Sequence, residues 1–132
     1  MAAVNRLLTY VDLDEAVTGA QHTSVTARLA AVLVDDRRVV LLNDRGWSWT
    51  SSAPTATRPQ ISAEDIEKEA RMVVGPDEPT GSETHEQMAA GHWSFLAGIL
   101  ARQGVDVRAR ELAELPHDVV LSEDLRARIR GQ

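Results

Sequence analysis

The sequence predicts an α+β domain in which a three-stranded antiparallel meander is followed by three to four helices packed on one face of the sheet. Three observations support this class. Residues 1–49 carry strand-type apolar patterns, residues 50–60 form a polar linker with two prolines, and residues 61–132 carry helix-type patterns. A chain of 132 residues is long enough to bury one hydrophobic core. We therefore expect residues 1–132 to form a single domain.

The N-terminal half contains the predicted strands. Residues 5–13 show the two-residue alternation of a half-buried strand. Residues 23–34 are β-branched at first and then almost continuously apolar, which is typical of a central strand covered on both faces. The polar run 35–38 predicts a hairpin turn before a third strand that starts with residues 39–42. A helix over residues 27–34 is the alternative, which the alanines favour and the valines disfavour.

Two capping patterns mark the first helices of the C-terminal half. Ser62 with Asp65, and Thr84 with Gln87, have the spacing at which side chains satisfy the free backbone N–H groups of a helix start. The first helix should end at Gly75. The second should be the principal core helix, because apolar side chains recur along it at three- and four-residue spacing: Met88, Phe95, Leu96, Ile99 and Leu100.

Shorter elements complete the C-terminal half. Gly104 stands where a left-handed residue should end the principal helix. Asp106 is the expected cap of a short helix that continues to Leu115. Residues 117–121 predict a short additional strand, and Ser122 is the expected cap of a last helix.

Composition narrows the classes of function. The formal net charge of −6 disfavours a nucleic acid as partner, since phosphate contacts need a basic surface, and favours a basic or neutral protein. The chain has no cysteine, so disulfides and thiolate metal sites are excluded, and we expect no cofactor. Neither a secretory signal nor a membrane span is visible, which predicts a cytoplasmic protein. Lys68 is the only lysine among 14 Lys and Arg residues, a bias that suggests a high-GC bacterium such as an actinobacterium.

Trp47 and Trp49 are the residues that most suggest a function. In a strand, residues two apart point to the same side, so both indoles would form one broad amphipathic surface of the kind common in binding interfaces. Core packing is the alternative for both, and Trp49, beside the linker, is the better candidate for exposure. Asp77 and Glu78 lie in an acidic, turn-rich loop and would supply the electrostatic part of the same protein-binding surface.

His92 is the centre of an alternative function, in which a pocket between the sheet and the principal helix binds a small ligand or performs acid–base chemistry. Trp93 and His85 would be the other residues of this pocket. The simpler interpretation is structural, with His92 hydrogen-bonded at the core boundary and Trp93 completing the core. We expect no metal site, because His85 and His92 lie two helical turns apart, a rise of about 10.5 Å.

Nucleic-acid binding is the third function considered. It would depend on arginines of the final third of the chain: Arg102, Arg108, Arg110, Arg126, Arg128 and Arg130. Acidic residues interleave with them, so a salt-bridged, solvated surface is the simpler interpretation. No catalytic motif stands out either. The sequence therefore favours a non-catalytic protein-binding module, of immunity or regulatory type, that acts on a partner protein or forms a homodimer.

Overall fold

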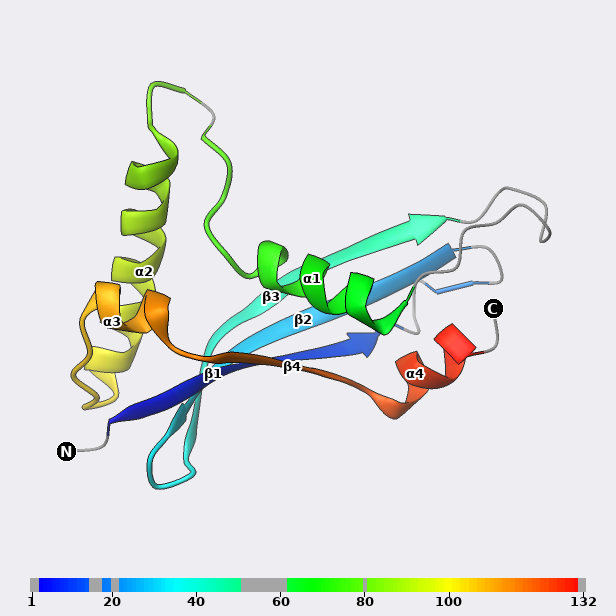
Figure 1. The fold of residues 1–132 in the computed structure, drawn as a ribbon, viewed down its shortest axis with the longest axis horizontal. Coiled ribbons are helices and arrows are strands. Elements are labelled where there is room, and N and C mark those ends of the chain that lie inside the picture. Colours follow the sequence, from blue (N-terminus) through cyan, green and yellow to red (C-terminus); the bar gives the residue numbers. More distant parts are fainter. Residues whose placement is uncertain (1–2, 15–17, 20–21, 51–61, 80, 131–132) are drawn as a thin grey trace.

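The computed structural model describes residues 3–14, 18–19, 22–50, 62–79 and 81–130. Its elements, in chain order, are β1 (Val4–Leu13), β2 (His22–Leu33), β3 (Arg38–Thr50), α1 (Ala63–Val73), α2 (His85–Arg102), α3 (Ala109–Glu114), β4 (His117–Leu121) and α4 (Glu123–Arg130). The strands form one sheet in the order β3-β2-β1-β4 (Figure 1). The predicted α+β class and its antiparallel meander are confirmed, and β4 adds a parallel strand beside β1.

The strands follow the sequence patterns closely. Residues 27–33 lie in β2 and pair with both β1 and β3, so the helical alternative for this segment is wrong. The predicted hairpin turn follows β2, and Asp36 within it adopts a left-handed φ of 68°. The third strand, which was expected to start with residues 39–42, is β3 and continues to Thr50, so the predicted linker begins one residue too early. The rest of the predicted linker, residues 51–60, lies outside the described residues.

All four described helices pack on one face of the sheet. One core cluster joins Leu7 and Leu29 of the strands to Leu96 of α2 and Leu112 of α3. A second cluster joins strand residues to α1 and α4: Val11, Val25, Ile66, Ala70, Leu121 and Leu125. In Figure 1, α1 crosses in front of β2 and β3, whereas α2 and α3 lie together at one end of the sheet. The predicted location of the helices on a single face is therefore confirmed.

The predicted helix caps are largely confirmed. Ser62 and Thr84 each form a complete capping box at the start of α1 and α2. The backbone N–H of Leu125 donates to the Ser122 hydroxyl at 3.2 Å, which caps α4. The prediction for Asp106 is wrong, because α3 starts later, after Arg108, and has no side-chain cap.

The apolar stripe predicted for α2 is only partly correct. Leu96 and Leu100 are fully buried, as expected. Phe95, in contrast, is 53% exposed, and Met88 is only half-buried. Helix α2 packs mainly on α3, and its most extensive contact with the sheet is with β3. Because α2 sits at the end of the sheet rather than across it, only a narrow stripe of its surface enters the core.

Strand β4 brings the C-terminal part of the chain against β1. Leu7 to Val11 pair in parallel with His117 to Leu121. The buried Thr9 hydroxyl is hydrogen-bonded to His117 Nε2 at 2.5 Å, and Arg6 pairs with Asp118 at 3.3 Å on the other side of the sheet. These contacts fix the register of two strands that are distant in sequence.

The second face of the sheet carries apolar side chains that no described helix covers. Leu8 and Ala30 are adjacent across β1 and β2, and Ala30 is opposite Val40 of β3. Tyr10 is opposite Val120 of β4. Tyr10, Val40 and Val120 are 43%, 46% and 40% exposed. Leu8 and Ala30 are themselves buried, so we call the three exposed residues, Tyr10, Val40 and Val120, the open sheet face.

Candidate functional site

Three adjoining hollows follow β3 along the margin of the helix-covered face. The tryptophan hollow, of about 260 Å³, is lined by Trp47, Trp49, Asp65, Ile66 and Glu69. The arginine hollow, of about 570 Å³, is lined by Asp44, Arg45, Gly46, Glu69, Arg71, Met72, Val73, Gly75, Pro76, Asp77 and Glu78. The histidine hollow, of about 390 Å³, is lined by Leu42, Arg45, Asp77, Gln87, Met88, Gly91, His92, Phe95 and Leu96. Neighbouring hollows share lining residues, so together they form one depression, which we call the β3 groove.

The groove lies beside the free edge of the sheet. β3 pairs only with β2 among the described strands, so its outer backbone groups have no strand partner there. The register between β2 and β3 shifts on both sides of Leu42, which bends β3 next to the hollows. Gly46 lies just beyond this bend, where a Cβ atom would lie 2.5 Å from the backbone oxygen of Val25, so this position requires glycine.

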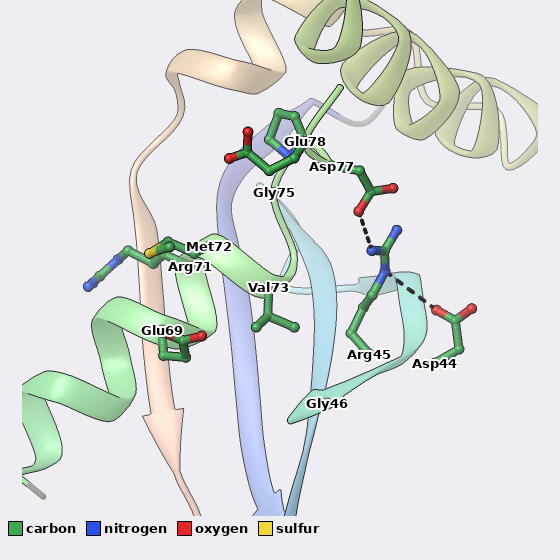
Figure 2. A pocket seen from close by; sticks show the side chains of 11 residues that line it. Asp44, Arg45, Gly46, Glu69, Arg71, Met72, Val73, Gly75, Asp77 and Glu78 are labelled. Carbon is green, nitrogen blue, oxygen red and sulfur yellow. Dashed lines mark hydrogen bonds and ion pairs between the residues drawn. The ribbon is translucent and has the colours of Figure 1, made fainter. Parts of the chain in front are cut away.

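Arg45 is the central charged residue of the groove. Its guanidinium Nη1 donates to Asp77 at 3.1 Å and its Nε lies 3.8 Å from Asp44 (Figure 2). The Arg45 side chain is only 28% exposed, so this bridge between β3 and the loop after α1 is partly desolvated. Arg71 points away from Arg45 in Figure 2 and donates to the backbone oxygen of His117. Arg45 thus separates the arginine hollow from the histidine hollow.

His92 lines the histidine hollow as a half-buried side chain. Its Nε2 atom is buried and has no hydrogen-bond partner among the described residues. Burial lowers the pKa of His92, the guanidinium of Arg45 lowers it further, and the Val74 backbone and Asp77 partly oppose this. The imidazole is therefore neutral near pH 7, and its buried Nε2 atom is left without a hydrogen bond among the described residues.

Trp47 and Trp49 lie on the same face of β3, opposite Val25 and Thr23 of β2. Both are half-buried. Trp47 packs against both core clusters and Trp49 against the second only, so each indole combines a core contact with an open side at the tryptophan hollow.

The other histidine-pocket residues lie elsewhere. Trp93 packs edge-on against His92, with ring centroids 4.8 Å apart, and contacts the first core cluster rather than the hollow. His85 is exposed at the start of α2, where its Nδ1 lies 3.6 Å from a carboxylate oxygen of Glu78. Within the ranges described above, no group of three His, Asp or Glu side chains is arranged to hold a metal ion.

The C-terminal arginines are spread over different elements. Arg128 donates to the hydroxyl of Thr23 and to backbone oxygens before and within β2, and Arg126 donates to the Leu121 oxygen. Arg108 lies 3.7 Å from Glu111. Arg102 and Arg110 are exposed. Arg126 and Arg128 therefore tie α4 to the sheet.

Three groove residues were not predicted from the sequence. Arg45 and Glu69 were not identified, and Asp65 was identified only as a helix-capping residue. Strand alternation would have placed Arg45 on the same face as Trp47, because the two residues are two positions apart. Asp65 and Glu69 are four residues apart and so share one helix face, but no sequence pattern shows which strand that face meets.

Comparison with family models, with curated proteins and with solved structures found no significant match. Among the described helices, none combines the length and the apolar character that crossing a membrane requires.

Proposed function

We propose that this protein is a non-catalytic binding module that recognises an extended segment of a protein partner along the β3 groove. The observation that carries the proposal is the β3 groove itself, a free strand edge next to three adjoining hollows. The groove contains the residues expected for protein binding, Trp47, Trp49, Asp77 and Glu78.

Strand addition accounts for the shape of the groove. A segment that pairs with the outer edge of β3 gains main-chain hydrogen bonds, and its alternate side chains point to the helix-covered face. Such side chains follow one another at about 6.6–6.8 Å, twice the rise per strand residue. They would enter successive hollows, where Met72 and Phe95 offer apolar contacts at 63% and 53% exposure. Backbone pairing would supply affinity and the hollows would supply sequence preference.

Charge favours a basic partner. Four carboxylates and two guanidinium groups line the arginine hollow, and the chain as a whole has a formal charge of −6. Complementary charge raises the rate of encounter and disfavours acidic competitors. An immunity or regulatory protein that masks a basic partner would use this chemistry. We place such a protein in the cytoplasm of a high-GC bacterium, on the basis of the arginine-rich composition and the apolar pattern.

A displayed library of random 12-residue peptides tests the proposal. Peptides selected on the wild-type protein should bind Phe95→Ala at least about five-fold more weakly, since an exposed aromatic contact of about 1 kcal/mol is lost. Tyr10→Ala, on the open sheet face and similarly exposed, is the matched control and should bind normally. Calorimetric titration measures both. Selected peptides whose affinity falls with Tyr10→Ala and not with Phe95→Ala would contradict the proposal.

A second copy of this chain is a second candidate partner, and the open sheet face favours it. Self-association there would cover Tyr10, Val40 and Val120, which are large apolar side chains left exposed on one face of the sheet. Light scattering after size-exclusion chromatography measures the mass of the particle. If the wild-type protein is a homodimer, Val40→Lys should convert it to a monomer. A monomeric wild-type protein would contradict self-association.

A small ligand in the histidine hollow is a third candidate, and the unpartnered Nε2 of His92 favours it. A thermal-shift screen of metabolites and nucleotides tests it. A ligand of this hollow should stabilise the wild-type protein and lose its effect in His92→Ala, and a ligand that stabilises both proteins equally would bind elsewhere.

A further inference from the structure

Two indoles and two carboxylates frame the tryptophan hollow. Trp47 and Trp49 come from β3, whereas Asp65 and Glu69 come from consecutive turns of α1. Ile66, which is 2% exposed, forms the apolar floor between them. The α1 positions are fixed by the capping box at Ser62, and the β3 positions by the register with β2. The walls of this hollow are therefore held by secondary structure on both sides.

The charge of this hollow is unbalanced within the described part of the chain. One oxygen of Asp65 accepts the backbone N–H of Ser62 at 3.2 Å, which leaves its second oxygen available. Neither Asp65 nor Glu69 takes part in an ion pair of the described residues. Among the described residues that line the hollow, none is basic. The neighbouring arginine hollow differs, because there Arg45 neutralises Asp77.

Aromatic faces and carboxylates together select a cation. The face of an indole attracts a cation through its quadrupole, and carboxylates add charge-assisted hydrogen bonds. A guanidinium group suits both contacts better than an ammonium group, because it is planar, stacks on an indole and donates in a fork to a carboxylate. We propose that the tryptophan hollow binds the guanidinium group of an arginine side chain carried by the partner segment.

This inference rests on the proposed function, since the arginine is placed on a segment that lies along β3. The tryptophan hollow adjoins the arginine hollow through Glu69, at the end of the groove nearest Thr50. An arginine at one end of the bound segment would therefore reach the indoles while residues further along meet Met72 and Phe95.

Nuclear magnetic resonance of the three indole N–H groups tests the inference directly. The probe is N-acetyl-arginine amide, and N-acetyl-citrulline amide is its neutral isostere. The arginine probe should shift the Trp47 and Trp49 signals in a saturable way and leave Trp93, which packs against the first core cluster, unchanged. Citrulline should shift none of them. Equal shifts with both probes, or shifts of Trp93 alone, would overturn the inference.

A matched pair of charge variants tests the role of α1. Glu69→Gln should weaken binding of the arginine probe about two- to five-fold, the effect of one solvent-exposed ion pair. Glu64→Gln removes an exposed charge from the same helix outside the hollow and should leave the affinity unchanged. Equal weakening in both variants would indicate a general effect of net charge and would overturn a specific site.

The two proposals can fail separately. If the selected peptides depend on Phe95 but show no preference for arginine at any position, the guanidinium site is wrong and the groove proposal stands. If the arginine probe binds at Trp47 and Trp49 but no peptide binding depends on Phe95, the guanidinium site stands and the groove proposal is wrong.

Discussion

Truncation of two adjacent residues of α2 should have very different effects on stability. Leu96 is fully buried in the first core cluster, so Leu96→Ala should lower the free energy of unfolding by about 2–5 kcal/mol. Phe95 is 53% exposed. Burial of the remaining half of a phenylalanine is worth about 0.7–1.5 kcal/mol, and alanine regains about 0.5 kcal/mol of helix propensity. The net cost of Phe95→Ala should therefore be about 1 kcal/mol or less.

Urea unfolding followed by circular dichroism measures both costs. The slope of free energy against urea should stay the same in both variants, because neither changes the surface that unfolding exposes by much. Adjacent helical residues point about 100° apart around the axis. If Phe95→Ala lowers the free energy of unfolding as much as Leu96→Ala does, α2 must bury the side that carries Phe95. Phe95 would then not be available to line the histidine hollow.

Three further predictions concern pH, glycines and a helix cap. Burial lowers the pKa of both His92 and His117 from 6.5, so the folded protein takes up protons less readily than the unfolded chain. The contribution of these two histidines to the free energy of unfolding should therefore be fully present above about pH 6.5 and be lost as the pH falls below it. Equal urea midpoints at pH 7.5 and 5.5 would contradict this. Gly46→Ala should destabilise the protein, because the new Cβ would lie 2.5 Å from a backbone oxygen, whereas Gly91→Ala has open space at its Cβ in α2 and should stabilise the protein by about 0.5–1 kcal/mol. Thermal unfolding compares the two variants. A melting temperature of Gly46→Ala at or above that of the wild type would refute the close approach. Thr84→Ala removes the acceptor of the α2 capping box and should cost about 1 kcal/mol in urea unfolding, so an unchanged midpoint would show that the cap contributes nothing.

Local signals made most of the fold predictable. Alternation of apolar residues located β1, and the capping boxes at Ser62 and Thr84 located two helix starts, because each depends on residues a few positions apart. Gly104, two residues after the end of α2, has a left-handed φ of 81°, as its position after the apolar pattern indicated. These interactions form within a single element, so the sequence carries them without knowledge of the tertiary structure.

Tertiary placement was less predictable. Phe95 fits the apolar period of α2, but α2 sits at the end of the sheet, so the helix buries a narrower stripe than its sequence offers. Asp106 has the chemistry of a cap, yet the chain between α2 and α3 continues to Arg108 before it turns helical. Each error arises because the sequence shows which residues are suited to a role and tertiary packing decides which of them fill it.

The candidate site divides in the same way. Residue type alone pointed to Trp47, Trp49 and His92, and all of them line the β3 groove. Arg45 was missed because its partner Asp77 lies 32 positions away, beyond helix α1. A groove is made of surfaces from separate elements, so its outline depends on long-range contacts that a local pattern does not record.

The pairing of β1 with β4 has a consequence for biosynthesis. Thr9 and His117, which are hydrogen-bonded in the folded protein, lie 108 positions apart. During translation β1 leaves the ribosome long before β4 exists, and one border of the nascent sheet stays unpaired in the meantime. Contacts between such distant residues also slow folding. A nascent chain that stops before His117 should therefore be a substrate for chaperones or proteases, and completion of the C-terminal region is what pairs the exposed edge of β1.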